Sequence, residues 1–575
     1  MKVGIDFGST YSAVAAYDPV SDRVEAIAAY EGEPATIPSV VSISKKGLVT
    51  CGKAAKDQIG KKSVRIFEAF KMLLTETDED MLRRRGYDST YTPKYIARLY
   101  LESVLRGVME RRNADRLEEV VICVPEIWCR NFKTLDGRSI LRDILVETDI
   151  QTDHVRVVTE PEAASAFIAY NYEKETQKTF NGHLLLVDYG GGTLDITLTE
   201  VRSDGNGRME IGYRESGGEG ENHPESGKSG TIGCAGIAYM NRVIEMALVD
   251  SDLFGDEREL DYTKPEFMEA VRDLESQLKS SERMKDIEDV FEEYGSEYEE
   301  MADILDDEDR EFISVEYDDE EIPVTYQHLY RAYREKIEQV LRAEIEDINA
   351  RVRKHIGADP CEPAAGSRDD FKIALVGGFG SFYLVKKQIA EIYKLDANNA
   401  IDRRVKNIAA DKREQAICLG AALLAAGKIT QQKTSRYSIG LYTVGSDRVK
   451  RLYYGIKCHQ VVDPGKPYYI CDGANRITYG ALAGNITHFA IEFSERTDRG
   501  GLMALKEEML DKLKALPVAG FWNVGFSLDE SDIVTFHITP SAIPGFDTGA
   551  EEMLIPLDSY QRMFDLTAVK EVTVE

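Results

Sequence analysis

Two copies of one local pattern constrain the fold of this chain more than any other feature. In the first copy, residues 3–14, an apolar strand ends in Asp6, turns through Gly8 and resumes as a second strand. In the second copy, residues 184–198, a strand of the buried type ends in Asp188, and three consecutive glycines, 190–192, precede the next strand. Glycine lets the backbone approach a phosphate closely, and successive N–H groups in such a turn form a nest for anions. One unit in each half predicts a duplicated fold that grips a phosphate chain between its halves.

The carboxylates at the strand ends add a second constraint. Two carboxylates that face one cleft repel each other unless they share a cation. Asp6 and Asp188 are therefore candidates to hold a magnesium ion that arrives with a nucleotide. The chain has neither a P-loop lysine signature nor a G-x-G-x-x-G motif after its first strand, which excludes the P-loop and Rossmann classes.

Two further segments fit this scheme. In residues 373–381 another buried strand runs into glycines, here placed to approach a nucleoside. Residues 416–423 form a helix of small side chains that is suited to close helix contact.

Bulk properties limit the class of protein. At 575 residues the chain exceeds a single hydrophobic core and predicts two or more domains. Its net charge of −30 argues against nucleic acid or an anionic membrane as the main partner. We see no signal peptide at Met1 and no apolar run near the ~20 residues that span a bilayer. The eight cysteines lack C-x-x-C pairs, which is typical of a reducing compartment, so we expect a cytoplasmic protein.

The strand and helix patterns divide the chain into three parts. Residues 1–427 alternate β-branched strands with helical patterns, which predicts an α/β nucleotide-binding domain. Residues 428–436 are polar and predict a linker that adds no strand to this domain. Residues 437–575 predict a β-sandwich. Its expected strands are 437–444, 452–457, 468–471, 486–493 and 533–538.

Three segments have local features of their own. Residues 216–230 are rich in Gly, Ser and Glu and predict a mobile loop. Residues 286–321 are strongly acidic, as expected for the solvated face of a helical subdomain or for an acidic docking surface. Leu502, Leu505, Met509, Leu513 and Leu516 recur at helical spacing and predict a helix, packed on the sandwich or binding a peptide.

Taken in order, these motifs resemble those of the actin, hexokinase and heat-shock ATPase superfamily, and within it the 70-kDa heat-shock (DnaK-type) chaperones. The matching segments are 5–12, 121–125, 159–164, 188–195 and 375–378. The resemblance implies an actin-like ATPase fold of two duplicated ribonuclease-H-like lobes over residues 1–427, followed by the β-sandwich. Residues 437–443, 489–497 and 526–536 are similar, more faintly, to strands of the family's peptide-binding domain.

The resemblance also implies roles for particular residues. The expected nucleotide contacts are Gly8, Ser9, Thr10, Tyr11, Gly190, Gly191, Gly192, Thr193, Gly236, Gly377, Gly378 and Ser381. Asp6 and Asp188 would hold magnesium through water, Lys71 would position the attacking water, and Glu160 and Asp195 would order that water and the metal. Phosphoryl transfer of this kind depends mainly on positioning and charge. The alternative for Lys71 is a surface lysine on an amphipathic helix.

Several positions depart from the family pattern. The acidic residues of one family segment are missing from residues 233–242, although Asn241 and Arg242 match it. Ser381 stands where the family has an arginine that stacks on adenine, and 275–281 is the nearest candidate for the adenosine clamp. The linker is polar rather than leucine-rich, and no helical lid follows the sandwich.

Three functions fit these observations. The first is a chaperone relative that hydrolyses ATP to ADP and phosphate, binds unfolded peptide segments or one dedicated client, and works with a co-chaperone or exchange factor. The second is a nucleotide-gated scaffold or regulator without general chaperone activity. The third is a small-molecule kinase, for which residues 437–575 offer no sugar-binding insert.

Overall fold

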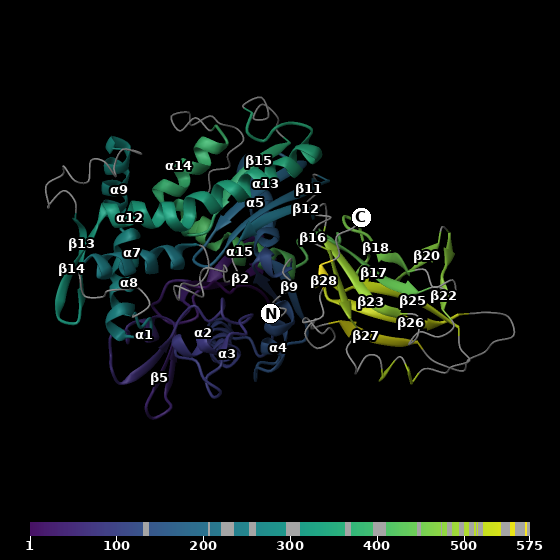
Figure 1. The fold of residues 1–575 in the computed structure, drawn as a ribbon, viewed down its shortest axis with the longest axis horizontal. Coiled ribbons are helices and arrows are strands. Elements are labelled where there is room, and N and C mark those ends of the chain that lie inside the picture. The colour runs from purple at the N-terminus through teal and green to yellow at the C-terminus, as the bar shows by residue number, and fades with distance from the viewer. Residues whose placement is uncertain are drawn as a thin grey trace. The chain divides into compact units, whose positions relative to one another are not determined.

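The computed structural model of the chain divides into two compact units (Figure 1). Unit 1 comprises residues 1–127, 143–211 and 215–430, and unit 2 comprises 128–142, 212–214 and 431–575. The division falls within α4 (Gly137–Val146), β12 (Met209–Glu219) and β16 (Ile429–Gln432). The structure describes residues 1–129, 137–204, 208–219, 235–251, 260–294, 311–362, 370–394, 410–444, 450–472, 474–479, 486–493, 500–504, 511–512, 514–515, 521–541, 552–557 and 570–571.

Two sheets of similar topology form the centre of unit 1. Each begins with an antiparallel meander of three strands, to which a strand from later in the chain is added in parallel. The first sheet runs β3 (Arg23–Ile27), β2 (Tyr11–Asp18), β1 (Lys2–Asp6), β8 (Glu119–Val124) and β9 (Val155–Thr159), with β4 (Thr36–Pro38) paired to β2. The second runs β15 (Phe371–Val376), β10 (Gly182–Tyr189), β11 (Leu194–Ser203), β12 and β16.

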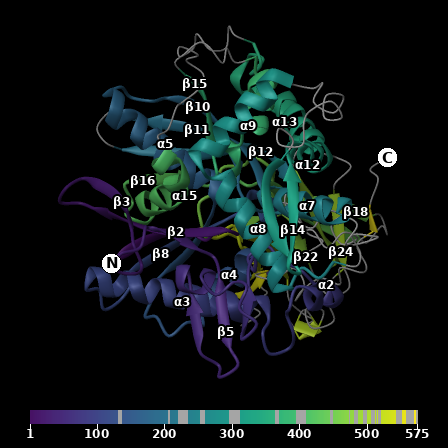
Figure 2. The same ribbon diagram turned by 90° about the vertical axis from the view of Figure 1, so that its left-hand side faces the viewer.

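The helices α5 (Glu160–Thr176) and α15 (Ala410–Ala425) lie between these two sheets (Figure 2). One apolar core joins side chains of both sheets and both helices. A Cβ on Gly420 would lie 1.6 Å from the carbonyl oxygen of Ala163, so only glycine allows the two helices to cross this closely. The carboxylate of Glu162 accepts hydrogen bonds from the hydroxyl (2.8 Å) and the backbone N–H (3.4 Å) of Thr159, which fixes the start of α5.

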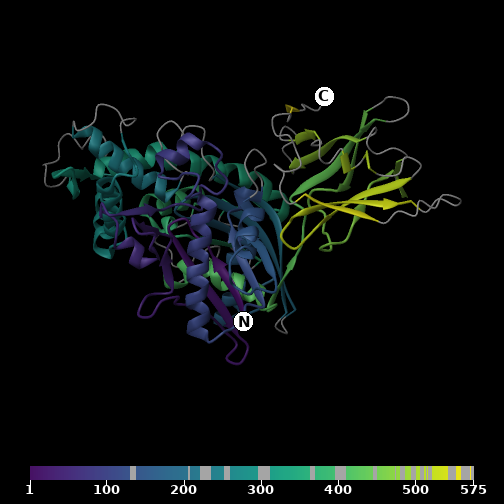
Figure 3. The same ribbon diagram turned by 90° about the horizontal axis from the view of Figure 1, so that it is seen from below.

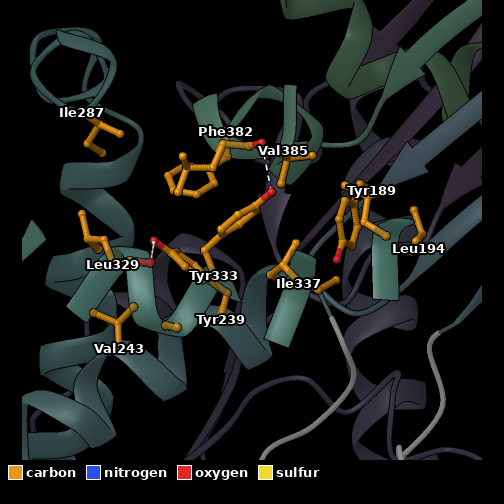
Figure 4. Packing of buried hydrophobic residues seen from close by; sticks show 14 of the residues in the cluster. Tyr189, Leu194, Tyr239, Val243, Ile287, Leu329, Tyr333, Ile337, Phe382 and Val385 are labelled. Atoms are coloured by element: carbon orange, nitrogen blue, oxygen red, sulfur yellow. Dashed lines mark hydrogen bonds between the residues drawn. The ribbon is translucent and has the colours of Figure 1, made fainter. Parts of the chain in front are cut away.

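A second core covers the other face of the second sheet (Figure 4). Tyr239 donates its hydroxyl to the carbonyl oxygen of Leu329 (3.3 Å), and Tyr333 donates to that of Leu384 (3.4 Å), so both buried phenols are satisfied. The elements of this layer are α7 (Gly236–Asp250), α8 (Pro265–Leu278), α9 (Ser281–Tyr294), β13 (Glu311–Tyr317), β14 (Glu320–Thr325), α12 (Tyr326–Tyr333), η4 (Arg334–Glu338), α13 (Gln339–Ile356), η6 (Phe379–Ser381) and α14 (Tyr383–Ile392).

A small sheet and several helices complete unit 1 beside the first sheet. The sheet has the order β6–β5–β7. These elements are β5 (Val41–Ser44), β6 (Val49–Cys51), α1 (Lys53–Lys56), β7 (Val64–Phe67), α2 (Glu79–Arg84), α3 (Pro93–Arg112) and η1 (Glu126–Cys129). No helix in the described ranges is both long and apolar enough to cross a bilayer.

Unit 2 is built from antiparallel strands in two main sheets (Figure 3). Gly455 lies against Phe526, because a Cβ there would be 2.9 Å from that ring, so one sheet packs on the other. The first sheet runs β18 (Lys450–Ile456), β17 (Tyr437–Val444), β23 (Ile486–Phe493), β24 (Gly500–Ala504) and β28 (Lys570–Glu571). The second runs β19 (Tyr468–Tyr469), β25 (Trp522–Leu528), β26 (Val534–Pro540) and β27 (Met553–Leu557), with β22 (Thr478–Tyr479) on β25; β20 (Cys471–Asp472) pairs with β21 (Asn475–Arg476).

Two expectations for the region before unit 2 need correction. Residues 216–219 were expected in a loop but continue strand β12, while 220–230 lie outside the described residues. Residues 429–432 were expected in an open linker but form the edge strand β16. A ladder requires backbone groups rather than apolar side chains, and only Ile429 is fully buried in this strand.

The polar residues that follow β16 are buried as well. Lys433 and Arg436 are 6% and 3% exposed, and both form ion pairs with Asp532, which is itself buried. Burial alone would raise the pKa of Asp532, but these two cations hold it below its ordinary value. The segment is therefore fixed within unit 2 by charge rather than solvated.

Two further predictions differ in part from the structure. Leu502 belongs to strand β24, where it pairs with Ala490 of β23, so the predicted helix does not begin there. Further along the predicted segment, residues 511, 512 and 514 are helical. Leu505, Met509, Leu513 and Leu516 lie outside the described residues. Within the acidic stretch 286–321, the described residues up to 294 belong to helix α9, and those from 311 onward form the hairpin β13–β14; residues 295–310 lie outside the described ranges.

Candidate functional site

The two Asp-headed turns each join neighbouring antiparallel strands of unit 1. In the first hairpin, β1 ends at Asp6, which lies opposite Ala13 of β2. In the second hairpin, Asp188 of β10 lies directly opposite Asp195 of β11. Like charges in direct cross-strand register destabilise a sheet. The repulsion between these two carboxylates therefore destabilises the second hairpin, and a bound cation would remove it.

The turns of the two hairpins are in direct contact. A Cβ on Gly191 would lie 2.3 Å from the hydroxyl oxygen of Thr10, and one on Gly192 would lie 2.7 Å from that of Ser9. No side chain fits at either glycine, so the close approach requires this residue type. The Met72 sulfur also lies against Gly192, at 2.4 Å from the same hypothetical Cβ. The structure thus places side by side two segments that are about 180 residues apart in the chain.

Hydrogen bonds fix both turns. In the first, the Ser39 hydroxyl donates to the carbonyl oxygen of Gly8 (2.7 Å), and its N–H donates to that of Thr10 (2.8 Å). In the second, the N–H groups of Gly236 and Ile237 at the start of α7 donate to the carbonyl oxygens of Gly190 and Gly191 (3.2 and 2.7 Å). Both turns are therefore held in shape by the protein itself.

A buried cluster of charge lies beneath the turns. Lys71 is 2% exposed and forms an ion pair with Glu160, which is 6% exposed and begins helix α5. Burial works against the Lys71 ammonium, but the carboxylates of Glu160 and Asp6 outweigh it and raise its pKa. The alternative of a surface lysine on an amphipathic helix is therefore wrong.

The aspartates of this cluster favour protonation in the ligand-free chain. Burial, with the Glu160 charge, raises the pKa of Asp6 from 3.8 to about 7, although Lys71 opposes this. Burial and the charges of Glu160, Asp195 and Asp6 raise the pKa of Asp188 well above its ordinary value. Asp195 accepts a hydrogen bond from the backbone N–H of Ile127 (3.3 Å), which orients that carboxylate. The single charge of Lys71 does not neutralise the carboxylates of Asp6, Glu160, Asp188 and Asp195. A further cation would therefore be stabilised in this cluster.

Unsatisfied buried atoms test whether a nucleotide with magnesium suits these residues. The Thr10 hydroxyl oxygen and the Asp188 Oδ2 are buried and make no hydrogen bond with the described residues. A phosphate oxygen would satisfy the first, and a cation or its bound water the second. Within the described ranges, no group of three or more His, Cys, Asp or Glu side chains could coordinate a metal directly. The residues therefore fit a metal that is held through water and phosphate rather than by a protein cage.

The third predicted loop adjoins the second hairpin. Strand β15 pairs in parallel with β10, and Gly377 (φ +79°) follows it immediately. A Cβ at Gly377 would be 2.6 Å from the Asp188 Oδ1. Ser381, at the end of η6, donates its hydroxyl to the carbonyl oxygen of Gly378 (2.7 Å) and so stabilises the loop itself. No cation stands at this position to stack on a nucleobase.

Near the first turn, Lys56, which the sequence did not single out, lies together with two residues of the segment 275–281 that was the nearest candidate for the adenosine clamp. The Lys56 ammonium contacts the Tyr11 hydroxyl (2.8 Å) and the Glu275 carboxylate of α8 (2.6 Å). Lys279 also binds Glu275 (2.8 Å) and lies over the Tyr11 ring at 3.7 Å. Burial alone would raise the pKa of Glu275, but Lys279 and Lys56 hold it below its ordinary value. Nothing in the sequence pattern marks Lys56, because its partner is 219 residues away.

Known proteins that are similar to this chain include heat-shock proteins and DnaK chaperones. Residues 2–216, which include both hairpins, Lys71 and Glu160, match the family model described as "Hsp70 protein". A "Chaperone protein DnaK" of Thermosipho africanus (strain TCF52B) is 26% identical over 429 residues, 74% of this chain and 58% of that protein. One of Nitrosopumilus maritimus (strain SCM1) is 30% identical over 222 residues, 36% of this chain and 30% of that protein.

A eukaryotic relative extends the same pattern. The "Heat shock cognate 70 kDa protein 3" of Dictyostelium discoideum is 28% identical over 226 residues, 35% of this chain and 34% of that protein. The chain thus spans between 30% and 58% of the length of these curated relatives. Over residues 2–216 and the regions aligned with these relatives, this chain is similar to the 70-kDa heat-shock proteins.

Proposed function

We propose that unit 1 is an actin-like ATPase domain that binds ATP with magnesium between its two Asp-headed turns and hydrolyses it to ADP and phosphate. The observation that carries this proposal is the contact between the turns, at Gly191 with Thr10 and Gly192 with Ser9. Glycines that face hydroxyl-bearing residues of another turn form a cradle of backbone N–H groups and side-chain donors suited to phosphate. The family match supports the proposal because it covers both turns.

The binding residues follow from this arrangement. Gly8, Ser9, Thr10 and Tyr11 would contact the terminal phosphates from one side, and the turn 190–193 from the other. Gly236, Gly377, Gly378 and Ser381 would face the nucleoside. Asp6 and Asp188 would hold magnesium through water, and that ion would neutralise charge on the phosphates.

The chain's own groups would then position the attacking water. Glu160 fixes the Lys71 ammonium by a buried ion pair, so this donor is held before substrate arrives. Ile127 fixes the Asp195 carboxylate through its backbone N–H, so an acceptor is oriented as well. A positioned donor and acceptor suit in-line attack of water on a phosphoryl group, where little covalent chemistry is required of the protein.

A matched pair of variants tests this proposal. Asp195→Asn keeps the shape of the side chain but removes the charge, and we expect ATP turnover to fall about 100-fold. Asp204→Asn, at an exposed position beyond the end of β11, is the control and should retain full turnover. Phosphate release from magnesium-ATP by the full-length chain is the readout. Equal turnover in the two variants would contradict the proposed site.

Unit 2 is proposed as the part that binds a client. Its two packed antiparallel sheets fit the sandwich expected of the family's peptide-binding domain. The proposed occupants are unfolded peptide segments or one dedicated client protein, with an exchange factor acting on unit 1. Binding of hydrophobic peptides in an array should weaken when ATP is added. If no peptide binds in either condition, the chain acts instead as a nucleotide-gated scaffold.

A further inference from the structure

A pocket beside the first turn contains polar groups that the proposed mechanism does not use. It lies between the segment after β7, the end of α2, and the helices α7 and α8, all within unit 1. We call it the Arg85 pocket; its polar lining includes Thr10, Glu68, Arg85, Asn241 and Tyr262. Lys71 and the glycines 190–192, which lie at the other side of the first turn, are not part of its lining.

Two nitrogen donors in this pocket lack acceptors. Asn241 is 5% exposed, and its Nδ2 makes no hydrogen bond with the described residues. The Nη2 of Arg85 is buried and is likewise without a partner there. Leaving a buried donor unsatisfied is unfavourable, and more so when the group is charged. Thr10, whose hydroxyl is already noted as unsatisfied, also lines this pocket.

The charge of Arg85 is also incompletely balanced. Its guanidinium stacks on the Tyr262 ring at 4.3 Å, which positions it without neutralising it. The Glu245 carboxylate also attracts it, but this group already accepts a hydrogen bond from Tyr262 (2.7 Å) and forms an ion pair with Arg242 (3.2 Å). Burial, with the charge of Glu275, raises the pKa of the neighbouring Glu68 to about 7, so a large part of its population is neutral near pH 7. The other cations of the pocket are already paired: Lys56 with Glu275 (2.6 Å) and Arg272 with Glu269 (3.0 Å).

A guanidinium, an amide and a hydroxyl that face one small pocket select for a compact anion with several acceptor oxygens. Phosphate meets this description, since its tetrahedral oxygens accept from all three directions and its charge complements Arg85. Thr10 belongs both to this pocket and to the turn proposed to hold the terminal phosphates. The Arg85 pocket therefore adjoins the turn at which a phosphate would be released.

We propose that the Arg85 pocket binds inorganic phosphate through Arg85, Asn241 and Thr10, and holds the phosphate released by hydrolysis before it leaves the chain. This inference rests on the proposed ATPase function. The same phosphate chemistry has a second source, a phosphate group of the bound nucleotide, and the experiment separates the two.

Calorimetric titration of inorganic phosphate into the full-length chain, with and without magnesium-ADP, tests the proposal. We expect wild-type protein to bind phosphate, and Arg85→Met and Asn241→Ala each to weaken this binding about 10-fold or more. Arg84→Met, an exposed arginine one residue earlier, is the matched control and should change it less than about 2-fold. Arg85→Lys, which retains the charge, should recover part of the affinity, so a loss through misfolding is distinguishable.

Titration of magnesium-ATP into the same variants gives the second arm. We expect ATP affinity to change less than about 3-fold, because the turns themselves are intact. Equal losses of ATP and phosphate affinity would assign the pocket to the nucleotide and overturn the proposal. So would a wild-type chain that binds ADP but no phosphate. A chain that binds phosphate at this pocket but no nucleotide would instead overturn the proposed ATPase function.

Discussion

The two Asp-headed hairpins have the same shape but different electrostatics. In the first, Asp6 shares its surroundings with Lys71, and its pKa rises only to about 7. In the second, burial and the charges of Glu160 and of the opposing Asp195 raise the pKa of Asp188 well above its ordinary value, although Lys71 opposes this. Lys71 thus opposes the rise in pKa at both hairpins, but the second hairpin places two carboxylates in direct cross-strand register, whereas the first pairs Asp6 with Ala13. This difference indicates that a bound metal ion would stabilise the second hairpin more than the first.

The largest expected effect follows from removing the charge at the second hairpin. Asp188→Asn should lower magnesium-dependent ATP turnover by about 100-fold or more, because the proposed metal loses its anchor. The nucleotide-free variant should melt no lower than wild type, since a repelled buried carboxylate has been replaced by an amide of similar shape. Turnover and melting temperature are the two measurements. Wild-type turnover, or a large loss of stability, would contradict this role.

Removing the cation at the first hairpin should have the opposite effect on stability. Lys71→Ala leaves Glu160 buried without a partner, and we expect it to cost about 3–5 kcal/mol of unfolding free energy and most of the turnover. The double variant Lys71→Met with Glu160→Gln removes both charges and should recover most of that stability without recovering turnover. Denaturant unfolding and phosphate release measure the two quantities. If stability and turnover return together, Lys71 serves structure alone.

The pH dependence of stability provides a smaller test of the first hairpin. Because the pKa of Asp6 is raised from 3.8 to about 7, the folded chain retains a proton that the unfolded chain has already released between these values. Stability from this group therefore falls as pH rises through that window and is lowest above pH 7. We expect the melting temperature of wild type relative to Asp6→Asn to decrease from pH 5.5 to pH 8.5, by a few degrees. Asp204→Asn should show no such trend relative to wild type, and a constant difference for Asp6→Asn would refute the assignment.

The smallest expected effect concerns the loop after β15, which adjoins the second hairpin but has no cation for a nucleobase. Ser381→Arg should increase ATP affinity by about 3–5-fold, as one stacking guanidinium contributes about 0.5–1 kcal/mol at an exposed site. Ser381→Lys is a control for charge without a planar group and should gain less. Calorimetry would show both. No gain in either variant would place the nucleobase away from this loop.

Local patterns were sufficient to predict much of the fold. Strands β17 and β23 have the predicted bounds, 437–444 and 486–493, because alternating side chains and flanking turn residues agree there. Gly420 marks the close contact of α15 with α5, as the run of small residues predicted. The turns at Gly8 and at 190–192 also lie where the sequence places them, and a Cβ would come within 2.4 Å of another atom at Gly8, Gly191 and Gly192, although nothing crowds Gly190.

Other features depend on contacts between distant segments and left no local signal. The leucines from 502 onward have helical spacing, but Leu502 pairs with Ala490 in a sheet, so tertiary pairing overrides the local pattern at this first position. Residues 511, 512 and 514 are helical, as the pattern predicts. The pocket donor Arg85 has no motif that identifies it, and the family segment that Asn241 matches does not predict this pocket; burial without a partner identifies both donors. Likewise, no sequence pattern around Asp532 predicts its ion pairs with Lys433 and Arg436 within unit 2.

Calorimetric titration of ATP into the full-length chain, with magnesium and then with the metal chelated, tests the joint phosphate site most directly. We predict one ATP bound per chain with magnesium, much weaker binding without it, and little binding of either kind after Gly191→Val, whose side chain would collide with Thr10. An ATP affinity that does not depend on magnesium, or that is unchanged in Gly191→Val, would contradict a nucleotide held between the two turns.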